Sequence, residues 1–172
     1  MESVKTYRLI DGHRVETGKT YGRDTEWSEE DKDCYIVGVN NWIVNSDGLF
    51  LVQRRALTKK NNPGKWSSTN GLVQPAEESI ETVIRETKEE LGIDINRDQI
   101  TLVEESHIAG EHLLVDIFVT RADVSLEDLT IQESEIDQIC YVPLDELLTL
   151  DVSTTCSYIR ELGQTIYKLS SK

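Results

Sequence analysis

The chain is predicted to fold as one α/β (α+β) domain spanning residues 1–172, and two local patterns carry that prediction. Residues 34–44 and 49–54 are rich in β-branched and aromatic side chains and are joined by a Ser-Asp-Gly turn, which is typical of a β-hairpin. Residues 79–91 instead place apolar side chains at helical spacing, and Gly92 after them is a common helix end. With 38% hydrophobic and 29% charged residues, the composition is that of a globular domain with a substantial core.

The other expected elements are spread along the rest of the chain. In order they are a hairpin with an Asp11-Gly12 turn in the N-terminal extension 1–33, strands at 100–109, 112–120 and 139–142, a short helix opened by Pro143, and a last helix within 153–169. Asp-Gly is a strong turn pair, and proline suits the first turn of a helix. Neither an internal repeat nor a second domain is evident, so we expect these elements to share one core.

The bulk properties argue against several classes of partner. A net charge of −14 would repel nucleic acid polymers and anionic membranes, whereas a small phosphate compound can still bind through a metal ion and a few local cations. No apolar run approaches the roughly 18 residues of a membrane span, and the first residues lack a signal-peptide pattern. Cys34, Cys140 and Cys156 are widely spaced and form no metal-binding pair. We therefore expect a cytoplasmic protein with a small-molecule partner.

The helix predicted at 79–91 carries a cluster of carboxylates. Glu86 and Glu90 are i,i+4 neighbours and Glu89 lies three residues from Glu86, so the three side chains project together. They lie beside the apolar stripe expected to face the sheet, which consists of Ile80, Val83, Ile84 and Leu91. Such a cluster repels itself unless a cation sits within it, and carboxylate oxygens are the ligands that Mg²⁺ or Mn²⁺ prefers. The alternative is a solvent-exposed acidic face, the usual role of a charge run.

The spacing around this cluster resembles the Nudix box. Gly71 is followed after five residues by Glu77, and after seven more by Arg85-Glu86-x-x-Glu89-Glu90-x-Gly92-Ile93, which spans residues 71–93. The LFLVQRR strand, the basic loop and the PGKW segment before the box, and Glu133–Ile136 after it, extend the resemblance over about residues 34–150. The N-terminal segment and the double-arginine strand most resemble the branch related to isopentenyl-diphosphate isomerase. The resemblance implies an α/β/α sandwich in which helices enclose a mixed sheet.

The resemblance also implies an activity and a set of roles. MutT-like Nudix hydrolases are pyrophosphatases that cleave a diphosphate bond in nucleoside diphosphate-linked or related small diphosphates, with Mg²⁺ (or Mn²⁺) bound. By position, Glu86, Glu89 and Arg85 are the catalytic candidates. The metal candidates are Glu86, Glu89, Glu90 and Glu135, of which Glu135 is alternatively the general base. Gly71 would permit close backbone approach, and Glu77 would pair with Arg85 to hold the loop on the helix.

Several other residues are candidates for binding the substrate. Arg54, Arg55 and Lys59 precede the box, and guanidinium and ammonium groups pair well with phosphate. The alternative is a basic edge that offsets local acidity. Trp66 is a candidate for stacking on a base, with a core or rim position as its alternative. The two histidines at 107 and 112 lack the spacing of a metal pair and are expected to be ordinary strand or surface residues.

Two other functions compete with hydrolysis. Isopentenyl-diphosphate isomerases need a cysteine and a histidine near the box glycine, and residues 67–73 contain neither. A noncatalytic Nudix-like module that binds a metabolite is the other alternative, and the intact box carboxylates speak against it. The sequence departs from the family pattern at Gln74, Ala76 and Thr87, of which Thr87 is expected to cost some packing.

Overall fold

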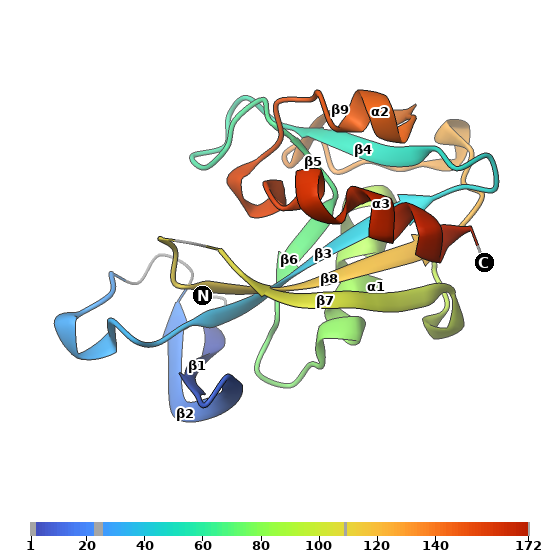
Figure 1. Ribbon diagram of the computed structural model, residues 1–172. Helices are drawn as coiled ribbons and strands as arrows, with labels where there is room; N and C mark the ends of the chain where they lie inside the picture. The colour runs from blue at the N-terminus through green and yellow to red at the C-terminus, as the bar shows by residue number, and fades with distance from the viewer. Residues whose placement is uncertain (1–2, 23–25, 109, 172) are drawn as a thin grey trace.

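A mixed sheet between helices organises the chain in the computed structural model, which describes residues 3–22, 26–108 and 110–171 (Figure 1). The strands are β1 (Ser3–Ile10), β2 (His13–Gly22), β3 (Ile36–Val44), β4 (Phe50–Arg55), β5 (Trp66–Ser67), β6 (Thr69–Leu72), β7 (Ile100–His107), β8 (Leu113–Arg121) and β9 (Ile136–Val142). The α-helices are α1 (Ser79–Leu91), α2 (Leu144–Leu147) and α3 (Ile159–Ser170). Short 3₁₀ turns lie at Glu29–Asp31, Arg97–Gln99, Leu126–Asp128 and Thr154–Cys156. No helix in the described part of the chain is long and apolar enough to cross a membrane.

The strand β3 is the branching point of the main sheet. The strand order is β5-β4-β3-β8-β7, with β6 also paired to β3 and β9 to β4. β3 and β8 run parallel along the centre. On its other edge, β3 pairs with β6 over residues 38–41 and with β4 only at Ile43 and Val44. The β4 and β6 strands therefore share one edge of β3 in succession, and Asn70, Gly71 and Leu72 of β6 lie at this branch.

Alternation along β8 shows how the sheet is covered on both faces. Val115, Ile117 and Val119 join the cluster that contains Ile159 and Ile166 of α3. Their neighbours Leu114 and Phe118 join the cluster that contains Val83 of α1. Because successive side chains of a strand point to opposite faces, α1 and α3 cover opposite faces of the sheet, and Figure 1 shows this arrangement. The predicted α/β/α sandwich with a mixed sheet is confirmed.

Helix α1 has the bounds that the sequence predicts. The Glu81 carboxylate accepts a hydrogen bond from the backbone N–H of Glu78 at 2.8 Å, and Gly92 ends the helix with φ 76°. Thr87 is fully buried on the side of the helix that faces the sheet, and its hydroxyl accepts a hydrogen bond from the side-chain amide of Asn41 at 3.4 Å. The Asn41 amide oxygen in turn accepts from Thr120 at 2.7 Å. The polar residue at this helix position therefore has a polar partner on the sheet.

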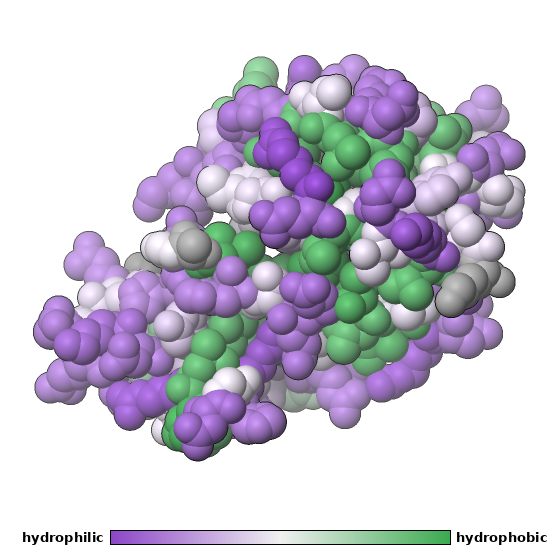
Figure 2. All heavy atoms as spheres, viewed as in Figure 1, coloured by the Kyte–Doolittle hydropathy of each residue, from purple (hydrophilic) through white to green (hydrophobic). Residues whose placement is uncertain are grey.

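The N-terminal hairpin is present and is longer than its turn signal alone indicates. Its turn uses left-handed backbone at Asp11 (φ 51°) and Gly12 (φ 80°). The hairpin is tied to the main domain by two backbone hydrogen bonds of 2.8 Å between Tyr7 and Tyr35. Apolar surface on this hairpin is visible in Figure 2, and Leu9 and Ile10 are among the exposed apolar side chains.

Some predicted boundaries change. β9 begins three residues before the predicted 139–142 strand, because pairing with β4 extends as far as Arg55↔Ile136. The predicted last helix at 153–169 is divided into a 3₁₀ turn at Thr154–Cys156 and α3 from Ile159. The short strands β5 and β6 were not expected. They consist of two and four residues, so their sequence carries little alternation to read.

Candidate active site

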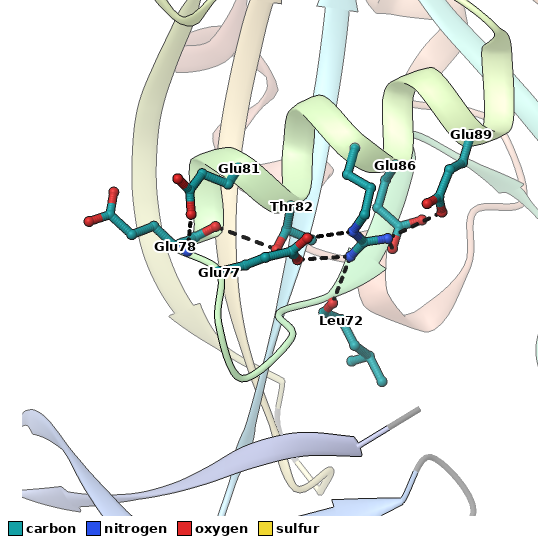
Figure 3. A network of polar contacts seen from close by, with 8 residues as sticks. Leu72, Glu77, Glu78, Glu81, Thr82, Glu86 and Glu89 are labelled. Atoms are coloured by element: carbon teal, nitrogen blue, oxygen red, sulfur yellow. Dashed lines mark hydrogen bonds and ion pairs between the residues drawn. The ribbon is translucent and has the colours of Figure 1, made fainter. Parts of the chain in front are cut away.

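Arg85 organises the acidic face of α1. Its Nε and Nη2 bind both oxygens of Glu77 at 2.7 and 3.0 Å, while Nη1 lies 2.8 Å from Glu86 and 3.2 Å from Glu89. Nη2 also donates to the carbonyl of Leu72 at 3.3 Å, and Figure 3 shows these groups around the guanidinium. The fork geometry of arginine allows this simultaneous pairing. Arg85 thus ties the loop that carries Glu77 to the helix.

Two pKa shifts reflect this network. Burial alone would lower the pKa of Arg85, but hydrogen bonding to Glu77 and the charge of Glu86 outweigh it, so the pKa lies above its usual value. The hydrogen bond from Arg85 lowers the pKa of the Glu77 carboxyl despite its partial burial. Both groups therefore remain charged over the neutral range, and the scaffold keeps its ion pair.

Gly71 on β6 allows the closest approach between strand and helix. A Cβ atom at this position would lie 2.0 Å from Oε1 of Glu86 and 2.1 Å from its Cδ. No other residue type fits without moving the Glu86 carboxylate. The glycine of the motif is thus required by the position of a side chain on α1.

Glu90 is a buried carboxylate, only 4% exposed, on the same face. Its Oε2 accepts from Nε2 of Gln53 on β4 at 2.7 Å. Desolvation raises the pKa of Glu90 to about 8, the Gln53 hydrogen bond opposes this rise, and the charges of Glu86 and Glu135 add to it. A carboxylate buried among carboxylates is costly unless a cation neutralises it.

The carboxylates line one small cavity of about 190 Å³. Its lining residues are Arg55, Asn70, Gly71, Leu72, Glu86, Glu89, Glu90, Gln132 and Glu135. Within the described residues, no three acidic, histidine or cysteine side chains are arranged as a ready metal-ligand set. The carboxylate oxygens that line this cavity nevertheless fit a hard divalent cation, which prefers oxygen ligands.

The three basic candidates occupy different places. Arg55 lines the acidic cavity, and its Nε donates to the carbonyl of Asn61 at 3.2 Å. Lys59 lies 2.6 Å from Glu135 and thereby reaches the edge of the cavity. Arg54 is paired with Asp137 and lines neither of the two cavities described here. Of these three cations, Arg55 lines the acidic cavity and Lys59 is paired with one of its carboxylates.

A larger cavity of about 620 Å³ adjoins the acidic one. The two share Arg55, Asn70, Gly71 and Leu72 in their linings. Its wall includes Trp27 and His112, whose rings stack with centroids 4.3 Å apart. The sequence did not single out Trp27, and His112 was expected to be an ordinary strand or surface residue. Only the tertiary fold brings these two positions together.

The remaining candidates of the sequence lie elsewhere. Trp66 packs against the main hydrophobic cluster and lines neither cavity, so its core or rim alternative holds. Cys34 and Cys156 are buried and Cys140 is half-buried, and none of them lines either cavity. A thiol placed for isomerase chemistry is therefore absent from both cavities, as far as the described residues define them.

Comparison with known proteins agrees with the motif. The NUDIX domain model matches residues 35–160. An uncharacterized Nudix hydrolase of Listeria monocytogenes is 30% identical over 148 residues, which cover 86% of this chain and 85% of the relative. The isopentenyl-diphosphate Delta-isomerase of Escherichia coli is 46% identical over 57 residues, 33% of this chain and 31% of that protein. The crystal structure of a MutT protein from Methanosarcina mazei matches with a TM-score of 0.63 and 25% identity, covering 80% of this chain and 96% of that chain.

Proposed function

Because the chain belongs to the Nudix hydrolase family, we propose that it hydrolyses a diphosphate bond in a nucleoside diphosphate-linked or related small diphosphate, with Mg²⁺ (or Mn²⁺) bound. The observation that carries this proposal is the cluster of four carboxylates, Glu86, Glu89, Glu90 and Glu135, around one cavity that also contains Arg55. Family members generally use divalent metals. The oxygen donors here suit such an ion, whose role is to neutralise phosphate charge and acidify a bound water.

The residues of the cluster have different surroundings, which favour different roles. Glu86 and Glu90 are held by Arg85 and Gln53, so their oxygens are preorganised to hold the cation. Glu89 has 55% of its side chain exposed, which leaves it freer to orient an attacking water and accept its proton. Glu135 shares the cavity and is the further ligand or base.

Arg55 is the group proposed to bind the substrate phosphates. It lines both cavities, so it lies where a diphosphate at the acidic end would continue into the larger space. Lys59, which is paired with Glu135, is a second cation near this cavity and would be available to a phosphate if Glu135 held the metal instead. Arg54 would contribute more indirectly, because Asp137 already engages its guanidinium.

The test is a hydrolysis assay with Mg²⁺ or Mn²⁺ over a panel of nucleotide-linked diphosphates. Glu86→Gln and Glu90→Gln are each expected to lower kcat/KM by about 100-fold or more, because each removes a charged ligand while keeping the shape of the side chain. Glu161→Gln, on an exposed position of α3, is the matched control and should retain activity. Full activity in the Glu86→Gln, Glu90→Gln double variant would refute the proposal, and tight binding without turnover would favour the noncatalytic module.

A further inference from the structure

An ion pair joins the loop of residues 56–65 to the acidic cavity. The ammonium nitrogen of Lys59 lies 2.6 Å from Oε1 of Glu135, and Glu135 lines that cavity. The two side chains are 24% and 23% exposed, so the pair is largely shielded from solvent. At this distance and burial the attraction is stronger than in a pair on the open surface. Lys59 is therefore a close cationic partner of a carboxylate that is proposed to hold the metal.

The backbone of Glu135 is anchored on two sides. Its N–H donates to the carbonyl of Gln132 at 2.8 Å, and its carbonyl accepts from the N–H of Ala56 at 2.8 Å. Gln132 is in turn bound to the end of α1, because its N–H donates to the carbonyl of Glu90 at 3.0 Å. Glu135 is thus held in a fixed place relative to the helix that carries the other carboxylates.

Lys59 is less constrained than its partner. It lies in a turn outside the helices and strands, where its N–H donates to the carbonyl of Ala56 at 3.1 Å. Its long, flexible stem allows the ammonium group to leave Glu135 while the backbone stays in place. When a second cation approaches Glu135, Lys59 is therefore the partner that moves.

A divalent cation at Glu135 would oppose the ammonium group of Lys59. Two positive charges against one carboxylate repel each other, and the repulsion is strong at a site shielded from water. The divalent ion has the advantage, because Glu86, Glu89 and Glu90 line the same cavity and attract a double charge more strongly than a single one. Metal binding and the Lys59–Glu135 pair are thus alternatives at one carboxylate.

We infer that Lys59 competes with the divalent cation for Glu135, so that metal binding releases the ammonium group at the edge of the cavity. The inference rests on the proposed function for the position of the metal ion. It gives Lys59 a role in metal loading, and it makes the arrival of the metal and the release of this lysine one event.

The first test measures Mn²⁺ binding without substrate, from the electron paramagnetic resonance signal of free Mn²⁺. Lys59→Met keeps an unbranched side chain without its charge and should bind Mn²⁺ about tenfold more tightly than the parent, which is the change expected if the competing pair is formed about nine-tenths of the time. Lys60→Met is the matched control. It removes the same charge from the next, exposed residue of the loop and should change the affinity by less than about twofold, because exposed charges are screened.

Glu135→Gln separates competition from a change in net charge. The substitution should itself weaken Mn²⁺ binding, and in that background Lys59→Met should have no further effect, because the charge for which both cations compete is gone. An equal gain from Lys59→Met with and without Glu135, or an equal gain in Lys60→Met, would overturn the inference. Unchanged Mn²⁺ affinity in Glu135→Gln would also overturn it, since Glu135 would then hold no metal.

The second test follows the release of Lys59 in the parent protein. Limited acetylation by acetic anhydride, read by mass spectrometry, should label Lys59 about threefold faster or more with saturating Mg²⁺ than with a chelator, while Lys60 is labelled at the same rate in both. Equal labelling of Lys59 in the two conditions would contradict its release. Metal-dependent hydrolysis without any effect of Lys59 on metal affinity would refute the inference alone, whereas competition at Glu135 without hydrolysis of any diphosphate would refute the proposed function alone.

Discussion

At the scale of single residues, Glu90 combines burial, a hydrogen bond and neighbouring like charges. Its side chain is 4% exposed, and its pKa is raised to about 8 from an ordinary value of 4.5. Between these two pH values the folded protein keeps a proton that the unfolded chain has lost. The free energy of unfolding contributed by this group is therefore complete below about pH 4.5 and declines as the pH rises towards 8.

This linkage predicts a pH-dependent effect of Glu90→Gln in metal-free protein. The amide cannot ionise, and its carbonyl can still accept from Gln53, so the variant should gain stability relative to the parent as the pH rises from 5 to 8. The gain should reach up to roughly 3 kcal/mol, following the size of the pKa shift. Urea unfolding with a chelator present at several pH values measures it. A difference between variant and parent that stays constant with pH would contradict the raised pKa.

Residue identities show what the sequence can and cannot predict about the site. The pairing of Arg85 with Glu77 was expected from the resemblance to the Nudix box and is present. The contact between Trp27 and His112 was not predicted, because it depends on the placement of two segments that are distant in the sequence. A contact between residues that only the tertiary fold brings together cannot be predicted from residue spacing along the sequence.

At the scale of elements, the sequence predicted most accurately those helices and strands whose bounds depend on their own residues alone. Helix α1 begins at Ser79 and ends at Leu91 as predicted, because its apolar stripe and Gly92 define it without help from the rest of the fold. The start of β9 and the existence of β6 depend instead on strand partners. β6 is formed by pairing with β3 over four residues, and it carries the glycine on which the site depends.

The substitution Gly71→Ala tests the contact between β6 and α1. The new Cβ would lie 2.0 Å from Oε1 of Glu86, so this carboxylate, a proposed metal ligand, would have to move out of its place in the cavity. Metal-dependent hydrolysis should fall about 100-fold, and stability should fall by about 1–3 kcal/mol from overpacking. Steady-state kinetics and urea unfolding measure the two effects.

Gly12→Ala separates stability from activity in that experiment. Its Cβ would meet nothing within 4 Å, but its φ of 80° favours glycine, so this variant should lose about 1 kcal/mol of stability and keep its activity. If Gly71→Ala loses only as much activity as Gly12→Ala, the close approach of strand and helix does not matter for the site.

At the scale of the whole molecule, the N-terminal hairpin joins the main domain through a buried charge. Arg14 on β2 places Nη1 2.6 Å from Oδ1 of Asp116 on β8, whose residue exposure is 4%. The other oxygen of Asp116 accepts from the hydroxyl of Ser79, the first residue of α1. One carboxylate thus connects the hairpin, the sheet and the helix that carries the acidic cluster.

Removing Arg14 should show how much the contact between the hairpin and the main domain contributes to the free energy of unfolding. Arg14→Ala leaves Asp116 buried without its cation, so the free energy of unfolding should fall by about 3 kcal/mol, and Asp116→Asn in the same background should recover part of that loss. Lys5→Ala is the matched control within the hairpin. It breaks the half-exposed pair with Glu16 at 3.2 Å and should cost less than about 1 kcal/mol. Equal effects of the two substitutions in urea unfolding would contradict this prediction and would mean that the hairpin adds little to the stability of the main domain.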